Sequence, residues 1–344
     1  MSDTRYLILA EGFSADPHYG KTMRGVLRYR RDDVVAILDS TRAGEAEEGV
    51  PVVGSVDDAL AFGPNAALVG VATQGGRFPP EWIALLRACL AAGLDLENGL
   101  HVFLSDLPEL RELAAANGAE IRDLRRPPRD LSTATGANLD VPATIVLTVG
   151  SDCAIGKMTV SLELDLEARR RGVASVFVPT GQTGIAIAGW GVSVDAVVAD
   201  FIAGAAERLV VEGAERGGEL LWVEGQGALL HPIYSGVTLG LYHGSVPHFL
   251  VLCHEAGRTE IEGAGGGPHP IPPLSDLVEL HERIALPARP SKVVAVALNT
   301  RSMTEDEARA AVEAAEAETG LPADDPVRFG AGRLTEAVLA ADKG

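Results

Sequence analysis

The segment GSDCAIGKMT, at residues 150–159, carries residue types that hold phosphate groups in proteins. It lies between the apolar run ATIVLTV and the segment VSLELDLEARRRG, so the pattern predicts a strand, a glycine loop and a helix. Such a loop directs backbone N–H groups and the positive end of the helix toward an anion, and Lys157 adds a point charge. The alternative is a turn that only lets strand and helix pack closely, with Lys157 in solvent. We favour a phosphate site, because the flanking strand and helix are the context that such a loop needs.

The loop departs from the common phosphate-binding pattern G-x-x-x-x-G-K-[ST] in two ways. Five residues separate Gly150 from Gly156, and Met158 stands between Lys157 and the first hydroxyl, Thr159. The displaced hydroxyl weakens the case for Mg²⁺ coordination by Thr159. The candidate cofactor-binding residues are those of the whole loop: Gly150, Ser151, Asp152, Cys153, Ala154, Ile155, Gly156, Lys157, Met158 and Thr159.

Glu224 is a second candidate, at the end of the apolar run LLWV and before the glycines of EGQG. Ligands collect at the carboxyl ends of the strands in a doubly wound sheet, so a carboxylate at this position is suited to a functional role. Glu224 can act there as a metal ligand or as a general base. The alternative is an acid in a polar turn, which we favour less.

Three histidines follow Glu224, and none has the spacing of a metal site. His231, His243 and His254 are each interpreted first as a structural histidine, although one of them can still be the catalytic base. Arg258 lies close to His254 and has two open interpretations. It can hold a substrate carboxylate through a bidentate pair, or it can be a solvated loop charge.

Short apolar runs and helical patterns alternate along the chain, which predicts two α/β domains with mostly parallel sheets. The expected strands are 6–10, 34–39, 66–72, 143–150, 174–180, 219–227, 248–256 and 292–300. The segment near residues 126–140 is rich in Pro, Ser, Thr and Gly and is the best linker. We therefore predict domains at 1–135 and 136–344. Asp200 and Thr304 are expected to cap helices, the second of which should end at Gly320.

The first domain gives little sign of a nucleotide site. No G-x-G-x-x-G follows its first strand, which disfavours a dinucleotide site of the familiar type. Lys21, Arg24, Gly75, Gly76 and Arg77 are interpreted as ordinary helix and loop residues; the alternative is that they line a cleft between the domains.

The composition limits the class of partner. A formal net charge of -19 opposes non-specific binding to nucleic acid and to anionic membranes, because both are polyanions. No long uncharged apolar stretch is present, so we expect a soluble, cytoplasmic protein. Cys89, Cys153 and Cys253 form an odd, widely spaced set that suggests neither disulfides nor a zinc site. Cys153 can be a nucleophile near a helix N-terminus, but a small filler in a tight loop is the favoured interpretation.

The chain resembles two groups of proteins. GSDCAIGKMT and LWVEGQGALL are similar to the long phosphate loop and the V-E-G-A-G strand end of dethiobiotin synthetase and related amide-forming enzymes, in which the glutamate helps to hold Mg²⁺. Together with ADFIAGAAE, VEGQGALLHPIYSGVTLGLYHGSVP, LVLCHE, KTMRGVLRYR and GLHVFLSD, the same motifs resemble the DgcN-type D-glutamate N-acetyltransferase family, formerly a domain of unknown function. This resemblance spans most of the chain.

The resemblance implies an N-terminal Rossmann-like domain, a C-terminal P-loop NTPase-like doubly wound domain and a homo-oligomer. It also implies transfer of the acetyl group of acetyl-CoA to the amino group of D-glutamate. On that interpretation the loop anchors the coenzyme, and Lys157, Glu224 and His231 are the catalytic candidates. Glu224 or His231 would deprotonate the amine, while Arg258 and His254 would bind the substrate.

Two other functions stay open from the sequence. An ATP-dependent amide-forming ligase or kinase would use Lys157, with Mg²⁺ held by Glu224 or Thr159, to act on a γ-phosphate of ATP. A regulator would bind a nucleotide and change its domain arrangement without turnover. The displaced Thr159 favours acetyl-CoA over Mg·ATP, and no metal is expected on the first interpretation.

Overall fold

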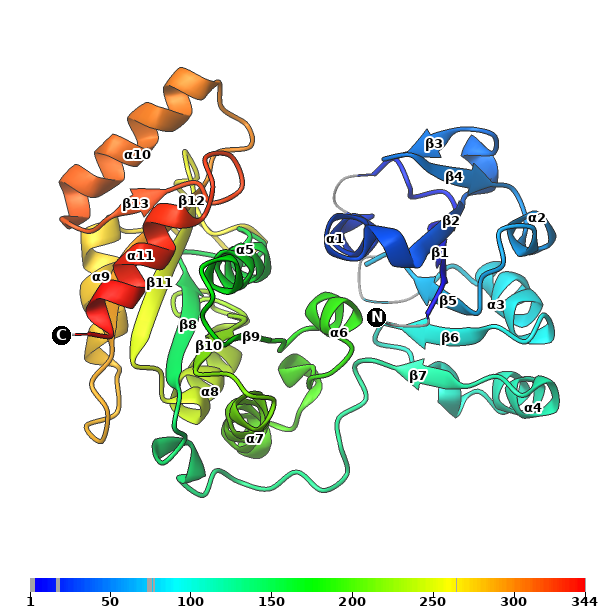
Figure 1. Ribbon diagram of the computed structural model, residues 1–344, viewed down its shortest axis with the longest axis horizontal. Helices are drawn as coiled ribbons and strands as arrows, with labels where there is room; N and C mark the ends of the chain where they lie inside the picture. The colour runs from blue at the N-terminus through cyan, green and yellow to red at the C-terminus, as the bar shows by residue number, and fades with distance from the viewer. Residues whose placement is uncertain (1–3, 17–18, 73–75, 77, 264, 344) are drawn as a thin grey trace. The chain divides into compact units, whose positions relative to one another are not determined.

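The computed structural model describes residues 4–16, 19–72, 76, 78–263 and 265–343. The chain forms two compact α/β units (Figure 1). One comprises Met1–Arg126 with Ile185–Trp190, and the other Pro127–Gly184 with Gly191–Gly344. The predicted domain boundary after residue 135 stays a prediction. In the described part of the chain, no helix combines the length and the apolar character needed to cross a membrane.

The first unit contains a seven-stranded sheet in the order β3-β4-β2-β1-β5-β6-β7, parallel except for the pair β3 and β4. Its strands are β1 (Tyr6–Leu9), β2 (Val34–Leu38), β3 (Ala46–Glu47), β4 (Val50–Val53), β5 (Ala66–Val69), β6 (Asp95–Asn98) and β7 (Ile121–Asp123). Its helices are α1 (Lys21–Tyr29), α2 (Val56–Leu60), α3 (Trp82–Ala91) and α4 (Pro108–Asn117). The central strands β1 and β5 are buried along their whole length, as expected of parallel strands covered on both faces.

A later segment of the chain completes the core of the first unit. Ile185 and Ala186, from helix α6 (Gln182–Ala188), are buried in the same hydrophobic cluster as the strands of this unit. Arg30 fixes the segment by donating from Nη1 to the Ala186 carbonyl oxygen at 2.9 Å. The first unit therefore depends on residues that follow β9 in the sequence.

The second unit contains a six-stranded, all-parallel sheet in the order β13-β12-β11-β8-β10-β9. Its strands are β8 (Thr144–Gly150), β9 (Ser175–Val178), β10 (Leu220–Val223), β11 (Phe249–Glu255), β12 (Lys292–Asn299) and β13 (Ala323–Asp324). Its helices, besides the start of α6, are α5 (Lys157–Arg170), α7 (Ile202–Glu215), α8 (Ser235–Ser245), α9 (Leu274–Arg283), α10 (Glu305–Thr319) and α11 (Gly332–Ala341).

Strand β8 lies at the centre of the second sheet and separates β10 from β11 (Figure 1). After β8 the chain builds β9 and β10 on one side, and it then crosses to build β11, β12 and β13 on the other. The strand order therefore reverses at β8 and β11. Beyond the carboxyl ends of two such strands lies the crevice in which open α/β sheets bind ligands.

The predicted fold class and the main predicted strands are confirmed. Thr304 caps α10 within a capping box, and Gly320 ends that helix in the left-handed conformation, both as predicted. The prediction for Asp200 is wrong: α7 starts after Phe201, and no side chain caps it. Some strands lie outside the predicted set: β4 contains Pro51, which is unusual for a strand, and β3 and β13 have only two residues each.

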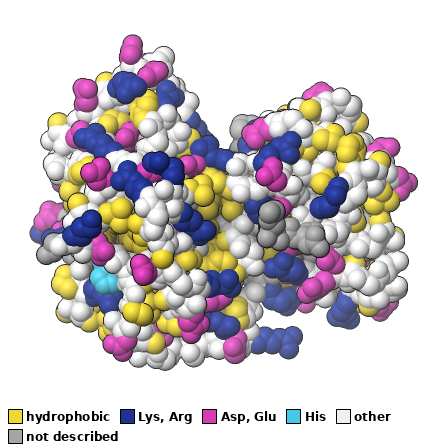
Figure 2. All heavy atoms as spheres, in the orientation of Figure 1, with side chains coloured by type: hydrophobic (Ala, Val, Ile, Leu, Met, Phe, Trp, Pro, Cys, Tyr) yellow, Lys and Arg dark blue, Asp and Glu magenta, His cyan; other side chains and the backbone are white. Residues whose placement is uncertain are grey.

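The surface carries both basic and acidic side chains, as expected from a sequence with 29 Lys and Arg and 48 Asp and Glu residues. On the face drawn in Figure 2, acidic and basic side chains are interspersed. Arg24, on α1, pairs with Glu47 at 3.3 Å, while Gly75 and Arg77 lie outside the described residues.

Candidate active site

The glycine loop connects β8 to α5 at the switch point of the second sheet. Ala154 and Gly156 adopt the left-handed conformation, with φ of 55° and 109°, and Gly156 is the N-cap of α5. Within the described chain, no acceptor is found for the N–H groups of Ala154, Ile155 and Gly156. Unpaired N–H groups at the start of a helix are a site for an anion. This loop therefore fits the phosphate groups of a nucleotide or of coenzyme A.

Lys157, the first residue of α5, lies beneath this loop. Its side chain is buried, and Nζ donates to the backbone oxygen of Asp152 at 2.7 Å. Burial lowers the pKa of Lys157, while neighbouring groups that include Asp152 and Glu224 oppose the shift. Gly225 makes room for the lysine stem, because a Cβ at that position would lie 1.8 Å from the Thr148 oxygen and 3.0 Å from Lys157 Cδ.

Glu224 lies just after β10, and its side chain is buried. Its carboxylate accepts the N–H groups of Thr180 at 2.9 Å and Gly181 at 3.1 Å, and the Gln226 amide at 3.1 Å. Burial raises the pKa of Glu224 to about 7, although these backbone hydrogen bonds and Lys157 act in the opposite direction. A carboxyl group with that pKa can exchange a proton near neutral pH, which suits a general base.

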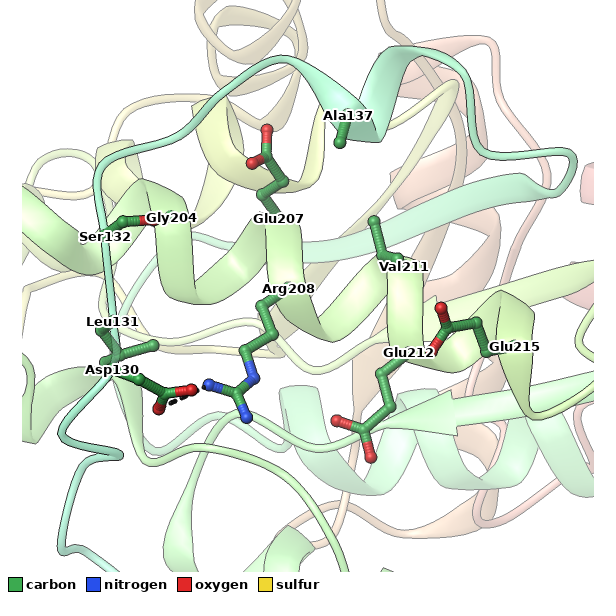
Figure 3. A pocket seen from close by; sticks show the side chains of 10 residues that line it. All are labelled: Asp130, Leu131, Ser132, Ala137, Gly204, Glu207, Arg208, Val211, Glu212 and Glu215. Atoms are coloured by element: carbon green, nitrogen blue, oxygen red, sulfur yellow. Dashed lines mark hydrogen bonds and ion pairs between the residues drawn. The ribbon is translucent and has the colours of Figure 1, made fainter.

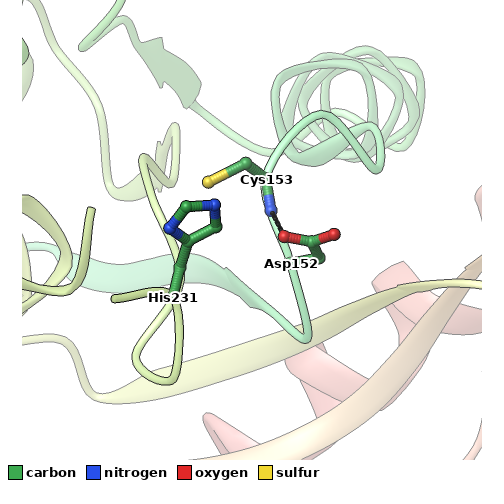
Figure 4. Close-up of side chains that lie close together, drawn as sticks. All are labelled: Asp152, Cys153 and His231. Atoms are coloured by element: carbon green, nitrogen blue, oxygen red, sulfur yellow. Dashed lines mark hydrogen bonds between the residues drawn. The ribbon is translucent and has the colours of Figure 1, made fainter. Parts of the chain in front are cut away.

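Asp152, Cys153 and His231 form a tight cluster at the loop (Figure 4). A carboxylate oxygen, the Sγ atom and an imidazole nitrogen lie within 4.8 Å of one another. His231 is buried; its Nδ1 accepts the Ile233 N–H at 3.2 Å, so its ring proton lies on Nε2, which is 3.3 Å from the Glu262 oxygen. The cysteine is only partly buried.

The cluster resembles a transition-metal donor set in its atom types, but its surroundings oppose a metal ion. Arg258 Nη1 lies 2.8 Å from the Asp152 carboxylate, and Lys157 Nζ binds the Asp152 backbone oxygen. Asp152, the one carboxylate in the cluster, therefore already contacts two basic side chains, which would repel a metal cation.

Arg258 and His254 both contact the loop. Arg258 pairs with Asp152, with Glu262 at 3.1 Å and with Glu255. Burial opposes the charge of Arg258, but the Asp152 hydrogen bond and the neighbouring carboxylates raise its pKa. His254 Nδ1 lies 2.8 Å from Ser151 Oγ, and burial and Arg258 lower its pKa.

The remaining candidate residues lie in α5, at the end of β12 and in α8. Met158 and Thr159 lie in the first turn of α5 and are partly buried. Asn299, at the end of β12, donates from Nδ2 to the Ile155 oxygen at 3.3 Å. His243 lies on α8, where its Nε2 is 3.0 Å from the Ile284 oxygen. The structure thus brings Glu224, His231, His254 and Arg258 to the glycine loop and leaves His243 on a helix.

A separate pocket of about 470 Å³ lies on the second unit, between the linker and α7 (Figure 3). Glu207 accepts the N–H groups of Thr135 and Gly136 at 2.8 and 2.7 Å, and Arg208 pairs with Asp130 at 3.0 Å. These contacts fasten the linker to the helix. Glu207, Arg208 and Asp130 thus serve to hold the chain together.

Family models identify both halves of the chain. The model described as a domain of unknown function (DUF1611_C), P-loop domain, matches residues 132–335, and the DUF1611_N Rossmann-like domain matches residues 39–127. The chain belongs to the DUF1611 family. The resemblance to a family formerly listed as a domain of unknown function is thereby confirmed, as are the Rossmann-like and P-loop domains.

Relatives of this DUF1611 protein include two curated proteins named D-glutamate N-acetyltransferase. The protein from Tritonibacter scottomollicae is 38% identical over 341 residues, covering 99% of this chain and 100% of the relative. The protein from a Pseudoalteromonas species is 35% identical over 277 residues, covering 80% of this chain and 82% of the relative. A crystal structure of a DUF1611 family protein from Anabaena variabilis is 42% identical, with a TM-score of 0.90, and covers 98% of this chain and 100% of that one.

Several site residues of this DUF1611 protein were missed from the sequence. Thr180, Gly181 and Gln226 hold the Glu224 carboxylate, and Glu262 joins Asp152, Arg258 and His231. The end of the predicted strand at 174–180 is the signal that could have found Thr180, because neighbouring parallel strands end at the same edge of a sheet. No local pattern marks Glu262.

Proposed function

We propose that the protein is a D-glutamate N-acetyltransferase that moves the acetyl group of acetyl-CoA to the amino group of D-glutamate. The observation that carries this proposal is the full-length match to a relative of that name at 38% identity. The small-molecule acceptor, the acetyl-CoA donor, a homo-oligomeric assembly and a cytoplasmic location belong to the same proposal.

The glycine loop fits the phosphate groups of coenzyme A. The N–H groups of Ala154, Ile155 and Gly156, which have no acceptor among the described residues, lie at the N-terminus of α5, and the Lys157 ammonium lies beneath them. Phosphate binding by such groups requires no hydrolysis of the ligand. Acetyl-CoA supplies the activated acetyl group, and the loop would hold the coenzyme.

Glu224 is the base that we propose for the acceptor amine. An amino acid carries an ammonium group at neutral pH, and this group must lose a proton before it can attack a thioester. Glu224, with its pKa raised to about 7, can take that proton. His231 is less suited to the task, because the Ile233 N–H already occupies its Nδ1 lone pair. His231 can instead donate its Nε2 proton to a developing negative charge that replaces its present contact, the Glu262 backbone oxygen at 3.3 Å.

The rival function is an ATP-dependent amide-forming ligase or kinase. The P-loop and the strand-end Glu224 are also the parts that such an enzyme needs, with Mg²⁺ on Glu224 or Thr159. In this structure the Glu224 carboxylate is held by two backbone N–H groups, which a metal would have to share.

One experiment separates the two functions. The purified protein is incubated with D-glutamate and acetyl-CoA, or with D-glutamate and Mg·ATP, while free thiol, ADP and phosphate are measured. We expect thiol release only in the first mixture, together with N-acetyl-D-glutamate. Release of ADP or phosphate in the second mixture, without thiol release in the first, would overturn the proposal. L-Glutamate serves as the matched control for the stereochemistry of the acceptor.

A further inference from the structure

Arg258 holds three carboxylates that differ greatly in exposure. The Asp152 side chain is 0% exposed and the Glu255 side chain 12%, whereas the Glu262 side chain is 71% exposed. The first two pairs are part of the packed protein. The pair with Glu262, at 3.1 Å, lies at the surface, where ion pairs contribute little to stability. One position on the Arg258 guanidinium is therefore filled by a carboxylate that is easily exchanged.

A second arginine lies next to the first. Glu255 bridges the two, because it pairs with Arg258 through one oxygen and with Arg301 through the other at 3.2 Å. The Arg301 side chain is 67% exposed, and in the described chain its ion pairing is to Glu255 alone. Two guanidinium groups thus flank one carboxylate at the carboxyl ends of β11 and β12, next to the glycine loop.

We propose, resting on the proposed acetyl transfer, that Arg258 and Arg301 form the carboxylate site for the acceptor, and that Glu262 occupies this site until the acceptor replaces it. The Glu262 side chain ends in the same group as the side chain of glutamate. A dicarboxylate acceptor can therefore displace it from Arg258 without leaving a buried charge unpaired. Its second carboxylate can pair with the exposed Arg301.

This arrangement selects dicarboxylic amino acids. An acceptor with an apolar side chain offers one carboxylate, so it either leaves Glu262 in place or leaves Arg301 without a new partner. Asp152 contributes by fixing Arg258 from its buried side, and the Glu262 N–H also donates to Asp152 at 2.9 Å. The backbone of Glu262 therefore stays fixed when its side chain moves away.

The test is the substitution Glu262→Gln, with Glu260→Gln as the matched control. Glu260 is an exposed acid two residues away that makes no ion pair in the described chain. Removal of the competing charge should lower the KM for D-glutamate about threefold, while kcat and the KM for acetyl-CoA stay unchanged. Arg301→Gln should raise the KM for D-glutamate about tenfold. Glu260→Gln should match the wild type.

Binding of glutarate, measured by calorimetry, tests the site without catalysis. Glutarate should bind the wild type and bind the Glu262→Gln variant more tightly, and Arg301→Gln should weaken it. An unchanged or raised KM for D-glutamate in Glu262→Gln, or glutarate binding that ignores both substitutions, would overturn the inference. If the wild type binds glutarate in this pattern but does not acetylate D-glutamate, the proposed acetyl transfer fails and the carboxylate site stands.

Discussion

Two buried carboxylates, one in each unit, follow strands of a parallel sheet but have opposite pKa shifts. Asp39, after β2, accepts the N–H groups of Gly12, Ser14 and Thr41 and the hydroxyl groups of both Ser14 and Thr41. Burial alone would raise its pKa, but these hydrogen bonds outweigh it and lower the pKa. Glu224, with three donors, has a pKa raised to about 7.

The difference shows what separates Asp39, a structural acid, from Glu224, the base that we propose, although both follow a strand. In the first unit the chain supplies enough donors to satisfy Asp39, so the charged form is favoured and the side chain fastens the segment at 12–14 to the turn at 40–42. In the second unit Glu224 keeps acceptor capacity, and the nearby loop has N–H groups for which the described chain provides no acceptor. Unfilled hydrogen-bonding capacity, more than position on the sheet, distinguishes the site.

The largest effect is expected for Glu224→Gln. Loss of the base should lower kcat about a thousandfold while acetyl-CoA still binds. The wild-type rate should rise with pH through about 7, as Glu224 loses its proton, and the variant should lack this rise. Steady-state rates of both proteins, measured from about two pH units below that pKa to about two above it, test this prediction. A variant that keeps the wild-type pH profile would remove Glu224 from the role of base.

Glu224→Gln should also change how stability depends on pH, and in the wild type stability should fall with pH where the rate rises. The pKa of Glu224 is raised from 4.5 to about 7 on folding, so the folded state holds the proton more tightly. The stabilisation is complete below the lower value and is lost as the pH rises through about 7. Thermal unfolding should therefore show a wild-type decline over this window that Glu224→Gln lacks.

Lys157→Met should have the next largest effect. The methionine keeps the apolar stem beside Gly225 but removes the ammonium, so acetyl-CoA affinity should fall about a hundredfold while the fold is retained. Calorimetric titration with coenzyme A measures the loss, and circular dichroism monitors folding. Unchanged affinity would mean that the loop is only a packing turn.

Asp39→Ala tests whether the buried acid of the first unit has only a structural role. Removal of a buried carboxylate that accepts five hydrogen bonds should destabilise this unit by about 2–3 kcal/mol, because the buried Ser14 N–H and hydroxyl groups lose their acceptor. The kcat of the folded fraction should stay within about twofold of the wild type. Calorimetric unfolding and rates at low temperature are the measurements. A lost kcat with unchanged unfolding would mean that Asp39, too, is a reactive group.

The smallest effect is expected for Asn299→Ala. Its single contact with the loop, to the Ile155 oxygen, is long at 3.3 Å, so the KM for acetyl-CoA should rise about twofold to threefold. Asn98→Ala, at the end of β6, is the matched change in the first unit. Asn98 is buried and bonds Val102 and Asp123 at 2.8 Å each, so its loss should reduce stability and leave the KM unchanged.

Local patterns correctly predicted where two candidate groups lie in the fold, while the roles of these groups stay predictions. The loop at 150–159 and Glu224 stand next to buried apolar strands, and both positions follow from the rule for strand ends. The network around Arg258 could not be predicted in this way, because Asp152 lies 106 residues earlier in the chain. His231 is also distant from Cys153 in the sequence and lies beside it only in the folded chain. The residues next to His231 in the sequence therefore suggested only a structural histidine.

The contribution of Ile185–Trp190 to the first unit affects the order in which the protein can fold during synthesis. A ribosome releases residues 1–126 first, and domains usually fold as they emerge. Here Ile185 and Ala186 are part of the first core, so that core is complete only after β8, the glycine loop, α5 and β9 have also been made. The nascent chain must therefore carry an unfinished N-terminal unit while the elements of the second one are already emerging.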